Sequence, residues 1–229
     1  MKKIIIIGAG AMGSAFAVPC LDNNNDITVI GTHLENSLIE SINSNNNTHP
    51  SLKTQFPNEI KFEKFEKLKA ILKQNIDIIV CAVSSVGIEW FVQQISKTYK
   101  KKVSIVLLTK GLSIVDNELS TLSDKIKNLL EKEGHSEINI SAIKGPCLAA
   151  GLANKMRTGA VIANKNLKES KFLKEIISTK YYSTEISEDI NGVELSGAIK
   201  NIYSMLIGAS EGLSNPKASK EIQSKYFLN

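Results

Sequence analysis

The chain has 229 residues, which is long enough for one large domain or for a large domain followed by a small one. Hydrophobic residues make up 42% and charged residues 22%, as in ordinary globular proteins, and no apolar run approaches the roughly 20 residues that cross a bilayer. The net charge of +5 comes almost entirely from lysine, since Arg157 is the only arginine. Nucleic-acid surfaces usually cluster arginines, so we expect neither a nucleic-acid partner nor membrane insertion. The first apolar stretch, Ile4–Ile7, is too short for a signal peptide, so we expect a cytoplasmic protein.

Cysteine and histidine spacing gives no sign of a metal centre or a disulfide framework. The chain has three cysteines without a C-x-x-C motif and three histidines without the spacing of metal ligands: Cys20, Cys81, Cys147, His33, His49 and His135. We therefore predict neither kind of site.

The first predicted element is a buried strand that runs into a glycine-rich turn. Residues 4–17 read IIIIGAGAMGSAFA, in which four isoleucines precede Gly8, and Gly10 and Gly13 complete a G-x-G-x-x-G spacing. An all-apolar, β-branched run is typical of a strand covered on both faces. Before a helix, the three glycines allow a tight turn, close approach of a pyrophosphate and close helix packing. The pattern predicts a dinucleotide site at the helix N-terminus; the alternative is an ordinary strand–helix junction without a nucleotide.

Strand-like and helical segments alternate through the middle of the chain. The strand-like runs are KIIIIG, DITVIG, IDIIVCAV, VSIVLLTKG, INISAIKGP and GAVIAN, with helical patterns such as GIEWFVQQISKTY and ELSTLSDKIKNLLEKEG between them. This alternation predicts an α/β fold of Rossmann type, a doubly wound parallel sheet with helices on both faces. Residues 41–58, SINSNNNTHPSLKTQFPN, are polar, rich in asparagine and twice interrupted by proline, which predicts a loop.

The pattern changes near residue 187, where one long helix is predicted. Ser187 or Asp189 is suited to cap it. Interior glycines cost a helix about 1 kcal/mol each, and close approach of another group would explain that cost. We predict a dinucleotide-binding Rossmann domain at 1–187 and the beginning of an all-helical second domain at 188–229. One apolar helix face carries Leu195, Ile199, Ile202 and Leu206, and a neighbouring face carries Val193, Gly197, Lys200 and Ser204.

The end of the second strand bears on the choice of cofactor, because ligands bind at strand ends in open α/β sheets. The segment reads VIGTHLEN, and Thr32 and His33 take the positions where NAD enzymes usually carry an acidic residue for the adenosine ribose, with Glu35 slightly later. No arginine follows for a 2′-phosphate. The predicted cofactor is therefore NAD or NADP, with a slight preference for NAD.

The other strand ends carry small residues and lysines. Residues 81–85, CAVSS, suit either a backbone that passes close to the cofactor or a plain cap of the next helix by one of the two serines. Lys110, Lys144 and Lys200 accompany the nucleotide fold, which favours an anion site. Cys147 is either a nucleophile or a small packed thiol, and the absence of a histidine in any recognisable relation to it favours the packed thiol.

Four segments in this order resemble the NAD(P)-dependent glycerol-3-phosphate dehydrogenases: GAGAMGSAFA, LTKGL, KGPCLAAGLA and DINGVELSGAIKNIY. The resemblance covers essentially the whole chain. The glycine motif alone occurs in many families, whereas the K-G, G-P and E-L-x-G-A-x-K-N set in this order is far more specific. GTHLE, THPSL and GPCLA resemble a divergent branch of that family.

The resemblance implies a reversible hydride transfer between nicotinamide C4 and C2 of dihydroxyacetone phosphate or sn-glycerol 3-phosphate, a small phosphorylated substrate. It implies that Lys200 is the general acid/base, that Lys110 contacts cofactor and substrate, and that Gly145, Cys147 and Asn201 contact the substrate. A ketone that is reduced develops negative charge on its oxygen, which an ammonium group stabilises. Lysine acts as a base where burial or a neighbouring cation lowers its pKa, an effect that Lys110 and Lys200 near one another would supply.

For the cofactor, the resemblance implies contacts from Ala11 and Met12 in the glycine-rich turn and from Ala149 after the G-P-C segment. The predicted cofactor site thus consists of these three residues together with Gly8, Gly10, Gly13, Thr32, His33 and Lys110.

The C-terminus departs from the family. Family members continue into a longer helical domain for substrate binding and dimerisation, with an S-R-N segment that contacts substrate and cofactor, and no such segment occurs here. The expectation is a fragment or a shortened relative, with a homodimer implied only if the helical domain is complete. The alternatives are a close relative that acts on another phosphorylated ketone or polyol, a related dehydrogenase of the hydroxyacid or ketopantoate type, and a dinucleotide-binding protein without catalysis.

Overall fold

The computed structural model of the chain describes residues 1–98, 103–115 and 117–214, without the side chains of Asn201, Glu211, Leu213 and Ser214. The strands are β1 (Lys3–Ile7), β2 (Asp26–Ile30), β3 (Thr48–His49), β4 (Thr54–Gln55), β5 (Lys61–Glu63), β6 (Ile78–Cys81), β7 (Ser104–Leu107), β8 (Leu112–Val115), β9 (Glu118–Thr121), β10 (Asn139–Lys144), β11 (Thr158–Ala163) and β12 (Tyr182–Ser187). The helices are α1 (Ala11–Asp22), α2 (Asn36–Ser44), α3 (Leu68–Ile71), α4 (Ile88–Ile95), α5 (Leu122–Lys132), α6 (Ala149–Ala153), α7 (Leu167–Ile177) and α8 (Ile190–Ser214), with 3-10 turns η1 (Phe65–Lys67) and η2 (Ser85–Gly87).

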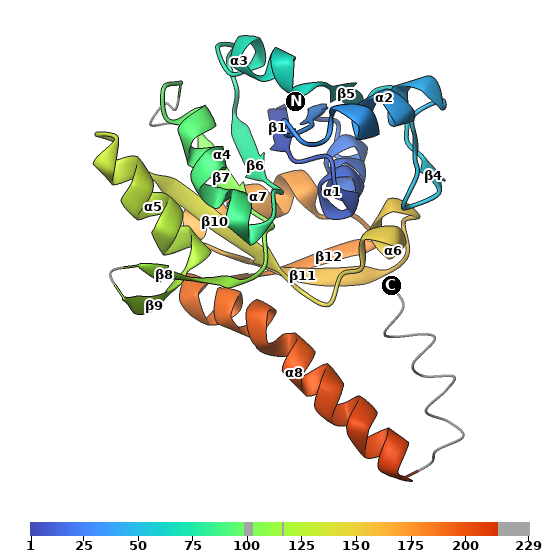
Figure 1. Cartoon of the computed structure of the whole chain (residues 1–229), viewed down its shortest axis with the longest axis vertical. Coiled ribbons are helices and arrows are strands. Elements are labelled where there is room, and N and C mark those ends of the chain that lie inside the picture. The colour runs from blue at the N-terminus through green and yellow to red at the C-terminus, as the bar shows by residue number, and fades with distance from the viewer. Residues whose placement is uncertain (99–102, 116, 215–229) are drawn as a thin grey trace.

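The main sheet has eight strands in the order β12-β11-β10-β7-β6-β1-β2-β5 (Figure 1). From β10 to β5 all neighbours run parallel, and residues 4–7 of β1 pair with β6 on one side and with β2 on the other. The chain order therefore reverses at β1, and open α/β sheets bind their ligands at such a point. The predicted Rossmann-type, doubly wound fold is confirmed.

The sheet is not wholly parallel, which corrects one expectation. β11 pairs antiparallel to β10, with Ala142 opposite Ala163, and β12 pairs parallel to β11. The connection from β10 to β11 holds only the short helix α6, and an antiparallel neighbour needs no long crossover. The edge strands β5 and β12 are absent from the predicted runs because buried and exposed residues alternate in them.

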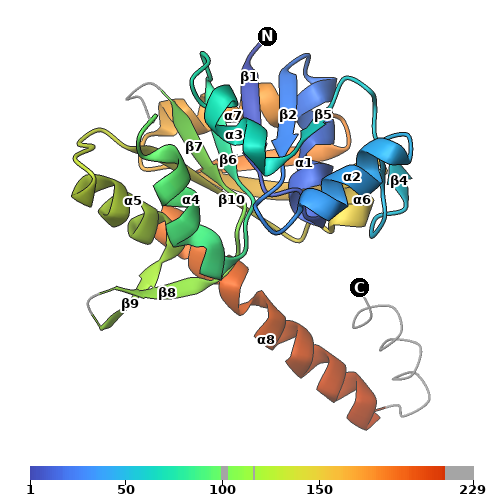
Figure 2. The same cartoon turned by 45° about the horizontal axis from the view of Figure 1, so that its top comes forward.

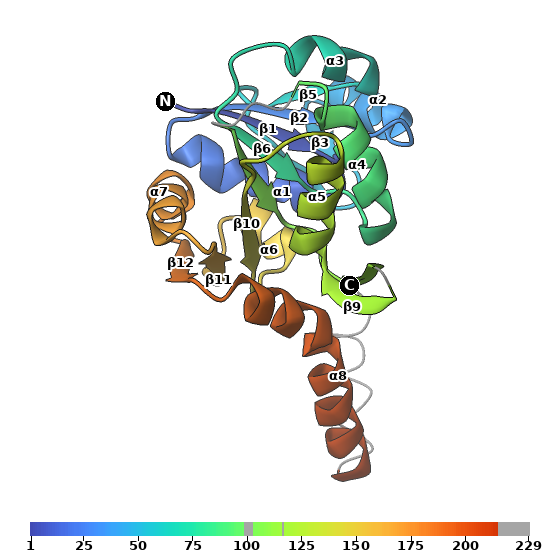
Figure 3. The same ribbon diagram turned by 90° about the vertical axis from the view of Figure 1, so that its left-hand side faces the viewer.

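Both faces of the apolar strands are covered, which explains their unbroken hydrophobic runs. Ile4 and Ile6 lie in one apolar cluster with residues of α1, α2, α6 and α7, whereas Ile5 and Ile7 lie in another with residues of α3, α4 and α5. Successive side chains of a strand point to opposite faces, so every second isoleucine enters a different layer. Figure 3 shows α1 and α7 on one side of the sheet and α4 and α5 on the other.

Two small hairpins stand outside the main sheet. β3 pairs with β4 inside residues 41–58, where a loop was expected, and β8 pairs with β9 between β7 and α5. The helix predicted over residues 118–134 therefore begins only at Leu122. Thr121 caps it, because its side chain accepts the N–H of Asp124.

Asp189 caps the long helix α8, which confirms one of the two predicted caps. Its Oδ1 accepts the N–H of Gly192 at 2.8 Å, and its own N–H donates to Oγ of Ser187 at 3.0 Å. From there α8 extends away from the sheet (Figure 2). Neither α8 nor any other helix within the described ranges is long and apolar enough to cross a membrane.

Only the first turns of α8 pack on the rest of the described structure. They contact β10, β11 and the β8–β9 hairpin, and Ile190 and Glu194 are buried there. The predicted apolar helix face is largely exposed, since Leu195, Ile202 and Leu206 are 43%, 57% and 62% exposed. The face that approaches the sheet is therefore the one that carries Glu194 and the small residues.

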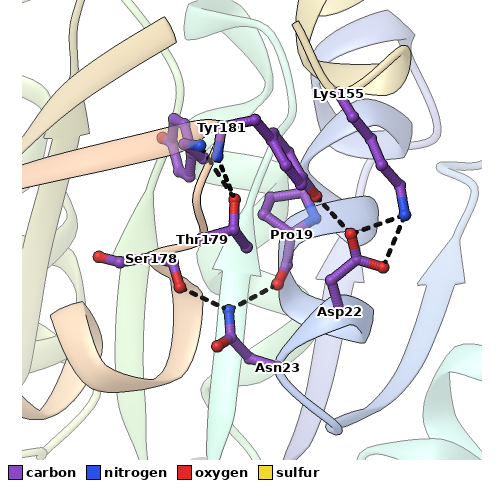
Figure 4. Close-up of polar contacts among 8 residues, drawn as sticks. Pro19, Asp22, Asn23, Lys155, Ser178, Thr179 and Tyr181 are labelled. Carbon is purple, nitrogen blue, oxygen red and sulfur yellow. Dashed lines mark hydrogen bonds and ion pairs between the residues drawn. The ribbon is translucent and has the colours of Figure 1, made fainter. Parts of the chain in front are cut away.

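A polar cluster joins the end of α1 to the residues after α6 and before β12 (Figure 4). Asp22 accepts the hydroxyl hydrogen of Tyr181 at 2.8 Å and forms an ion pair with Lys155 at 2.8 Å. The side-chain amide of Asn23 donates to the carbonyl oxygen of Ser178 at 3.0 Å. The helix that follows the glycine-rich turn is thereby fixed to the far edge of the sheet.

Candidate functional site

The glycine-rich turn is closed on its inner side and open on its outer side. Gly8 has a φ of +112°, and a Cβ there would lie 2.6 Å from the carbonyl oxygen of Ala82, so only glycine fits. A Cβ at Gly13 would lie 2.1 Å from the carbonyl oxygen of Gly8, so α1 packs directly on the turn. At Gly10, the atom nearest to an added Cβ is Oε1 of Glu35 at 3.8 Å. No contact with the described residues therefore requires glycine at position 10.

The open side of the turn coincides with the beginning of α1. Gly10 is the residue before the helix, and no side chain caps it. Ala11 and Met12 follow in the first turn and are half-buried. The first N–H groups of a helix have no partner within the helix, so this end suits an anionic ligand.

Glu35 ties the end of β2 to the glycine-rich turn. Its Oε2 accepts the N–H of Ala9 at 3.1 Å and the N–H of Thr32 at 2.8 Å. Thr32 is half-buried next to this carboxylate, whereas His33 is exposed and packs on Trp90 with ring centroids 5.2 Å apart. The acidic group beside the turn is thus Glu35.

His49, in the β3–β4 hairpin, contacts the same part of the turn. It is 1% exposed, its Nε2 donates to the carbonyl oxygen of Ala9 at 3.1 Å, and its Nδ1 accepts the N–H of Leu52 at 3.4 Å. Burial lowers the pKa of His49, opposed by the bond to Ala9 and by the charge of Glu35. The neutral imidazole with its proton on Nε2 fits these partners.

The carboxyl ends of β6 and β7 are held side by side. Thr109 Oγ1 donates to the carbonyl oxygen of Val83 at 2.7 Å. Gly111, with a φ of +127°, passes close to Ser85, whose Cβ would lie 3.4 Å from a Cβ at Gly111. Ser84 precedes η2, but its side chain makes no capping bond. The segment 81–85 therefore adjoins the lysine-bearing turn, and Ser84 makes no capping bond to the helix turn that follows it.

Lys110, Lys200 and Cys147 meet at this edge of the sheet. Partial burial, and then the charge of Lys200, lower the pKa of Lys110. Burial raises the pKa of Cys147, while the charges of Lys110 and Lys200 oppose that rise. Cys147 is 6% exposed, and a thiol with a raised pKa stays protonated, which favours the packed thiol over the nucleophile. Three distant parts of the chain thus supply one cluster.

Lys144 does not share an open anion site with the other two lysines, which corrects that expectation. It is 4% exposed, and its Nζ donates to the carbonyl oxygens of Leu107 at 3.0 Å and Thr109 at 2.7 Å. Burial lowers the pKa of Lys144 to about 8, although the charge of Glu194 acts to raise it. The ammonium group of Lys144 therefore donates its hydrogen bonds to backbone carbonyl oxygens and not to an anion in an open site.

Among the remaining predicted residues, Gly145 and Ala149 follow β10, and Asn201 lies in α8. A Cβ at Gly145 would lie 2.6 Å from the carbonyl oxygen of Gly159, so this glycine allows β11 to approach. Ala149 begins α6 and packs against the apolar layer that contains α1. Asn201 follows Lys200 in α8, and its side chain lies outside the described part of the structure. Within residues 1–98, 103–115 and 117–214, no group of three or more His, Cys, Asp or Glu is placed to hold a metal ion.

Comparison with known proteins identifies the family. Residues 3–170 match the family described as "NAD-dependent glycerol-3-phosphate dehydrogenase N-terminus". The chain belongs to this family. An NADP(+)-dependent glycerol-3-phosphate dehydrogenase of Archaeoglobus fulgidus is 33% identical over 214 residues, which cover 93% of this chain and 62% of the relative. A glycerol-3-phosphate dehydrogenase [NAD(P)+] of Mesoplasma florum is 32% identical over 203 residues, 87% of this chain and 58% of the relative. The chain thus spans about three fifths of the length of these relatives.

Solved structures of glycerol-3-phosphate dehydrogenases share the fold. The enzyme of Plasmodium falciparum matches with a TM-score of 0.78 at 22% identity, over 96% of this chain and 62% of that one. The enzyme of Coxiella burnetii matches with a TM-score of 0.76 at 24% identity, over 97% and 65%. At these identities the likeness establishes the fold only.

The sequence prediction missed His49 and Glu194 and gave Glu35 a secondary place. The THPSL segment that contains His49 is among those that resemble the glycerol-3-phosphate dehydrogenase family, but no spacing shows that its imidazole reaches the glycine-rich turn. Glu194 stands in the E-L-x-G-A-x-K-N segment, where a helical pattern alone gives no sign that a carboxylate is fully buried. Both contacts depend on packing between segments distant in the chain.

Proposed function

We propose that this chain binds a nicotinamide dinucleotide on the turn from Gly8 to Gly13 and takes part in reversible hydride transfer to C2 of dihydroxyacetone phosphate, which gives sn-glycerol 3-phosphate. The observation that supports the proposal is the effect of the Lys200 charge on the pKa of Lys110, which follows β7 at the strand edge that also carries the glycine-rich turn. The glycerol-3-phosphate dehydrogenases it resembles support it. The chain spans about three fifths of the length of these relatives, and their complete reaction is a proposal for it.

The open side of Gly10 fits the pyrophosphate of such a cofactor. The described residues leave room for a side chain at Gly10, but that side chain would fill the space in front of the α1 N-terminus. The first-turn residues Ala11 and Met12, and Ala149 at the beginning of α6, would hold the dinucleotide there. When bound, the nicotinamide ring supplies or accepts the hydride.

The two lysines provide the charge and the proton that the reaction needs. The substrate carbonyl oxygen gains negative charge as C2 is reduced, and Lys200 donates a proton from Nζ to that oxygen, which leaves an alcohol and a neutral amine. In the reverse direction the neutral amine removes the hydroxyl proton. Lys110 places a second positive charge beside it, and Gly145, Cys147 and Asn201 would contact the phosphorylated substrate.

Glu35 favours NAD over NADP. A carboxylate at the end of the second strand accepts hydrogen bonds from the hydroxyls of the adenosine ribose, and it repels a 2′-phosphate. Glu35 already lies against Ala9 and Thr32, and no arginine stands nearby in the segment 31–36. The homodimer and the cytoplasmic location stay predictions.

The test is the loss of absorbance at 340 nm when dihydroxyacetone phosphate is mixed with NADH or NADPH and this chain. We expect turnover, faster with NADH, that disappears in Lys200→Ala and persists in the matched control Lys127→Ala, whose lysine forms an exposed pair with Glu131. NADH binding without turnover would favour a dinucleotide-binding protein without catalysis. Absence of NADH binding would contradict the proposal itself.

A further inference from the structure

Lys144 is a buried lysine that the proposed reaction does not use. It ends β10, is 4% exposed, and bridges the carbonyl oxygens of Leu107 and Thr109 through Nζ, at 3.0 and 2.7 Å. Both acceptors lie just before Lys110 in the chain. A buried ammonium group is costly unless its donors are paired, so these contacts hold the end of β7 in one position.

The stem of Lys144 also touches α8. A Cβ at Gly197 would lie 3.2 Å from Cγ and Cδ of Lys144, which is tighter than ordinary contact, so glycine allows the helix to approach the lysine this closely. Lys200 follows one helical turn later, on the same side of α8. Lys144 therefore contacts both the segment that carries Lys110 and the helix that carries Lys200.

Glu194 supplies the balancing charge from α8, one turn before Gly197. It is 0% exposed, its Oε1 accepts the N–H of Ser123 at 3.1 Å, and its Oε2 has no hydrogen-bond partner among the described residues. Burial raises the pKa of Glu194, whereas the charge of Lys144 lowers it. The other titratable groups that face Lys144 are Cys81 of β6 and Lys110.

We propose that Lys144, balanced by Glu194, is a positioning residue that sets the spacing between Lys110 and Lys200. The inference rests on the proposed function, in which those two lysines act on the substrate. Without the Lys144 ammonium group, the carbonyl oxygens of Leu107 and Thr109 lose their shared donor, and the charge of Glu194 on α8 loses its balancing charge. The segment with Lys110 and the helix with Lys200 are then free to separate.

The charge coupling between Lys110 and Lys200 reports their spacing. The ε-amine of Lys110 is titrated in the whole chain by competitive acylation with acetic anhydride at a series of pH values, followed by mass spectrometry of peptides. Lys200→Met removes a neighbouring positive charge and raises the titration midpoint of Lys110. We expect this shift to fall to half or less when Lys144→Met is already present. Lys125→Met is the matched background, because Lys125 forms its ion pair with Glu89 at 2.7 Å on another part of the surface and leaves the shift unchanged.

An equal shift in the wild-type and Lys144→Met backgrounds overturns the inference. If Lys144→Met does not fold, Glu194→Gln, which has nearly the same size, replaces it; we expect the same loss of coupling, and an equal shift again overturns the inference. Quenching of tryptophan fluorescence by NADH is measured on each variant. A wild-type chain that does not bind NADH contradicts the proposed function, whereas retained binding with unchanged coupling contradicts only the positioning role of Lys144.

Discussion

A methyl group added at each of two glycines of the same turn distinguishes a glycine that leaves room for a ligand from a glycine that is required for packing. In Gly10→Ala, the backbone angles of −60° and 173° suit alanine, and the nearest atom to the new Cβ is 3.8 Å away. We expect the free energy of unfolding to stay the same or to rise by about 0.4–1 kcal/mol, since alanine restricts the unfolded chain. In Gly13→Ala, the Cβ would lie 2.1 Å from a backbone oxygen and 2.9 Å from Cβ of Ala82, so overpacking costs about 1–3 kcal/mol or more.

The order of the two variants is reversed for cofactor binding. At a temperature where both fold, Gly10→Ala is the variant that binds NADH more weakly. The methyl group at position 10 stands where the pyrophosphate would approach, so Gly10→Ala loses at least about tenfold in NADH affinity, or roughly 1.4 kcal/mol. Urea unfolding gives the stability, and quenching of Trp90, the only tryptophan, gives the affinity. A Gly10→Ala variant that binds NADH like the wild type, or that unfolds as easily as Gly13→Ala, would contradict a pyrophosphate site at Gly10.

Four further changes test other contacts. Lys200→Ala removes turnover at 340 nm but leaves NADH affinity within about twofold, because a proton donor acts in the transition state; retained turnover contradicts its role. His49→Ala weakens NADH binding roughly tenfold, because the carbonyl of Ala9 loses a donor that fixes the turn; unchanged quenching argues against this. Asp22→Ala lowers the free energy of unfolding in urea by about 1–2 kcal/mol, since two partners lose their acceptor; an unchanged value shows that the cluster is not stabilising. Burial lowers the pKa of Lys144 to about 8 from 10.5, so as pH rises the folded chain loses this proton before the unfolded chain does. The free energy of unfolding therefore increases by about 1–3 kcal/mol between pH 8 and about 10. Lys144→Met removes this increase, and parallel curves of unfolding free energy against pH for the variant and the wild type would contradict it.

The fold was predictable because the central strands are apolar throughout. Residues 4–7 enter two different helix layers, and a strand of that kind is visible in sequence without knowledge of its neighbours. The strands β5 and β12 were not predictable, since their residues are half exposed and depend on the sheet edge for their conformation. The antiparallel direction of β11 depends on the short connection after β10, and the hydrophobic periodicity of the sequence does not indicate the direction of a strand.

The candidate site likewise has a part that the sequence predicts and a part that depends on packing between distant segments. The glycine-rich turn is recognisable in the sequence because Gly8 has a positive φ and a Cβ at Gly13 would clash with the carbonyl oxygen of Gly8. Which lysine faces solvent and which is buried depends on the approach of α8 to β10, and Lys144 and Lys110 look alike in sequence. Glu35 bonds across 26 residues to Ala9, and contacts of that range follow only from the assembled sheet.

Isotope transfer tests most directly whether hydride transfer occurs at this strand edge. Dihydroxyacetone phosphate is incubated with this chain and NADH deuterated at nicotinamide C4 on the transferred face, and the product is analysed by mass spectrometry. We predict sn-glycerol 3-phosphate with one deuterium at C2, and none in Lys200→Ala. Tight NADH binding with no deuterium in any product would contradict hydride transfer by this chain.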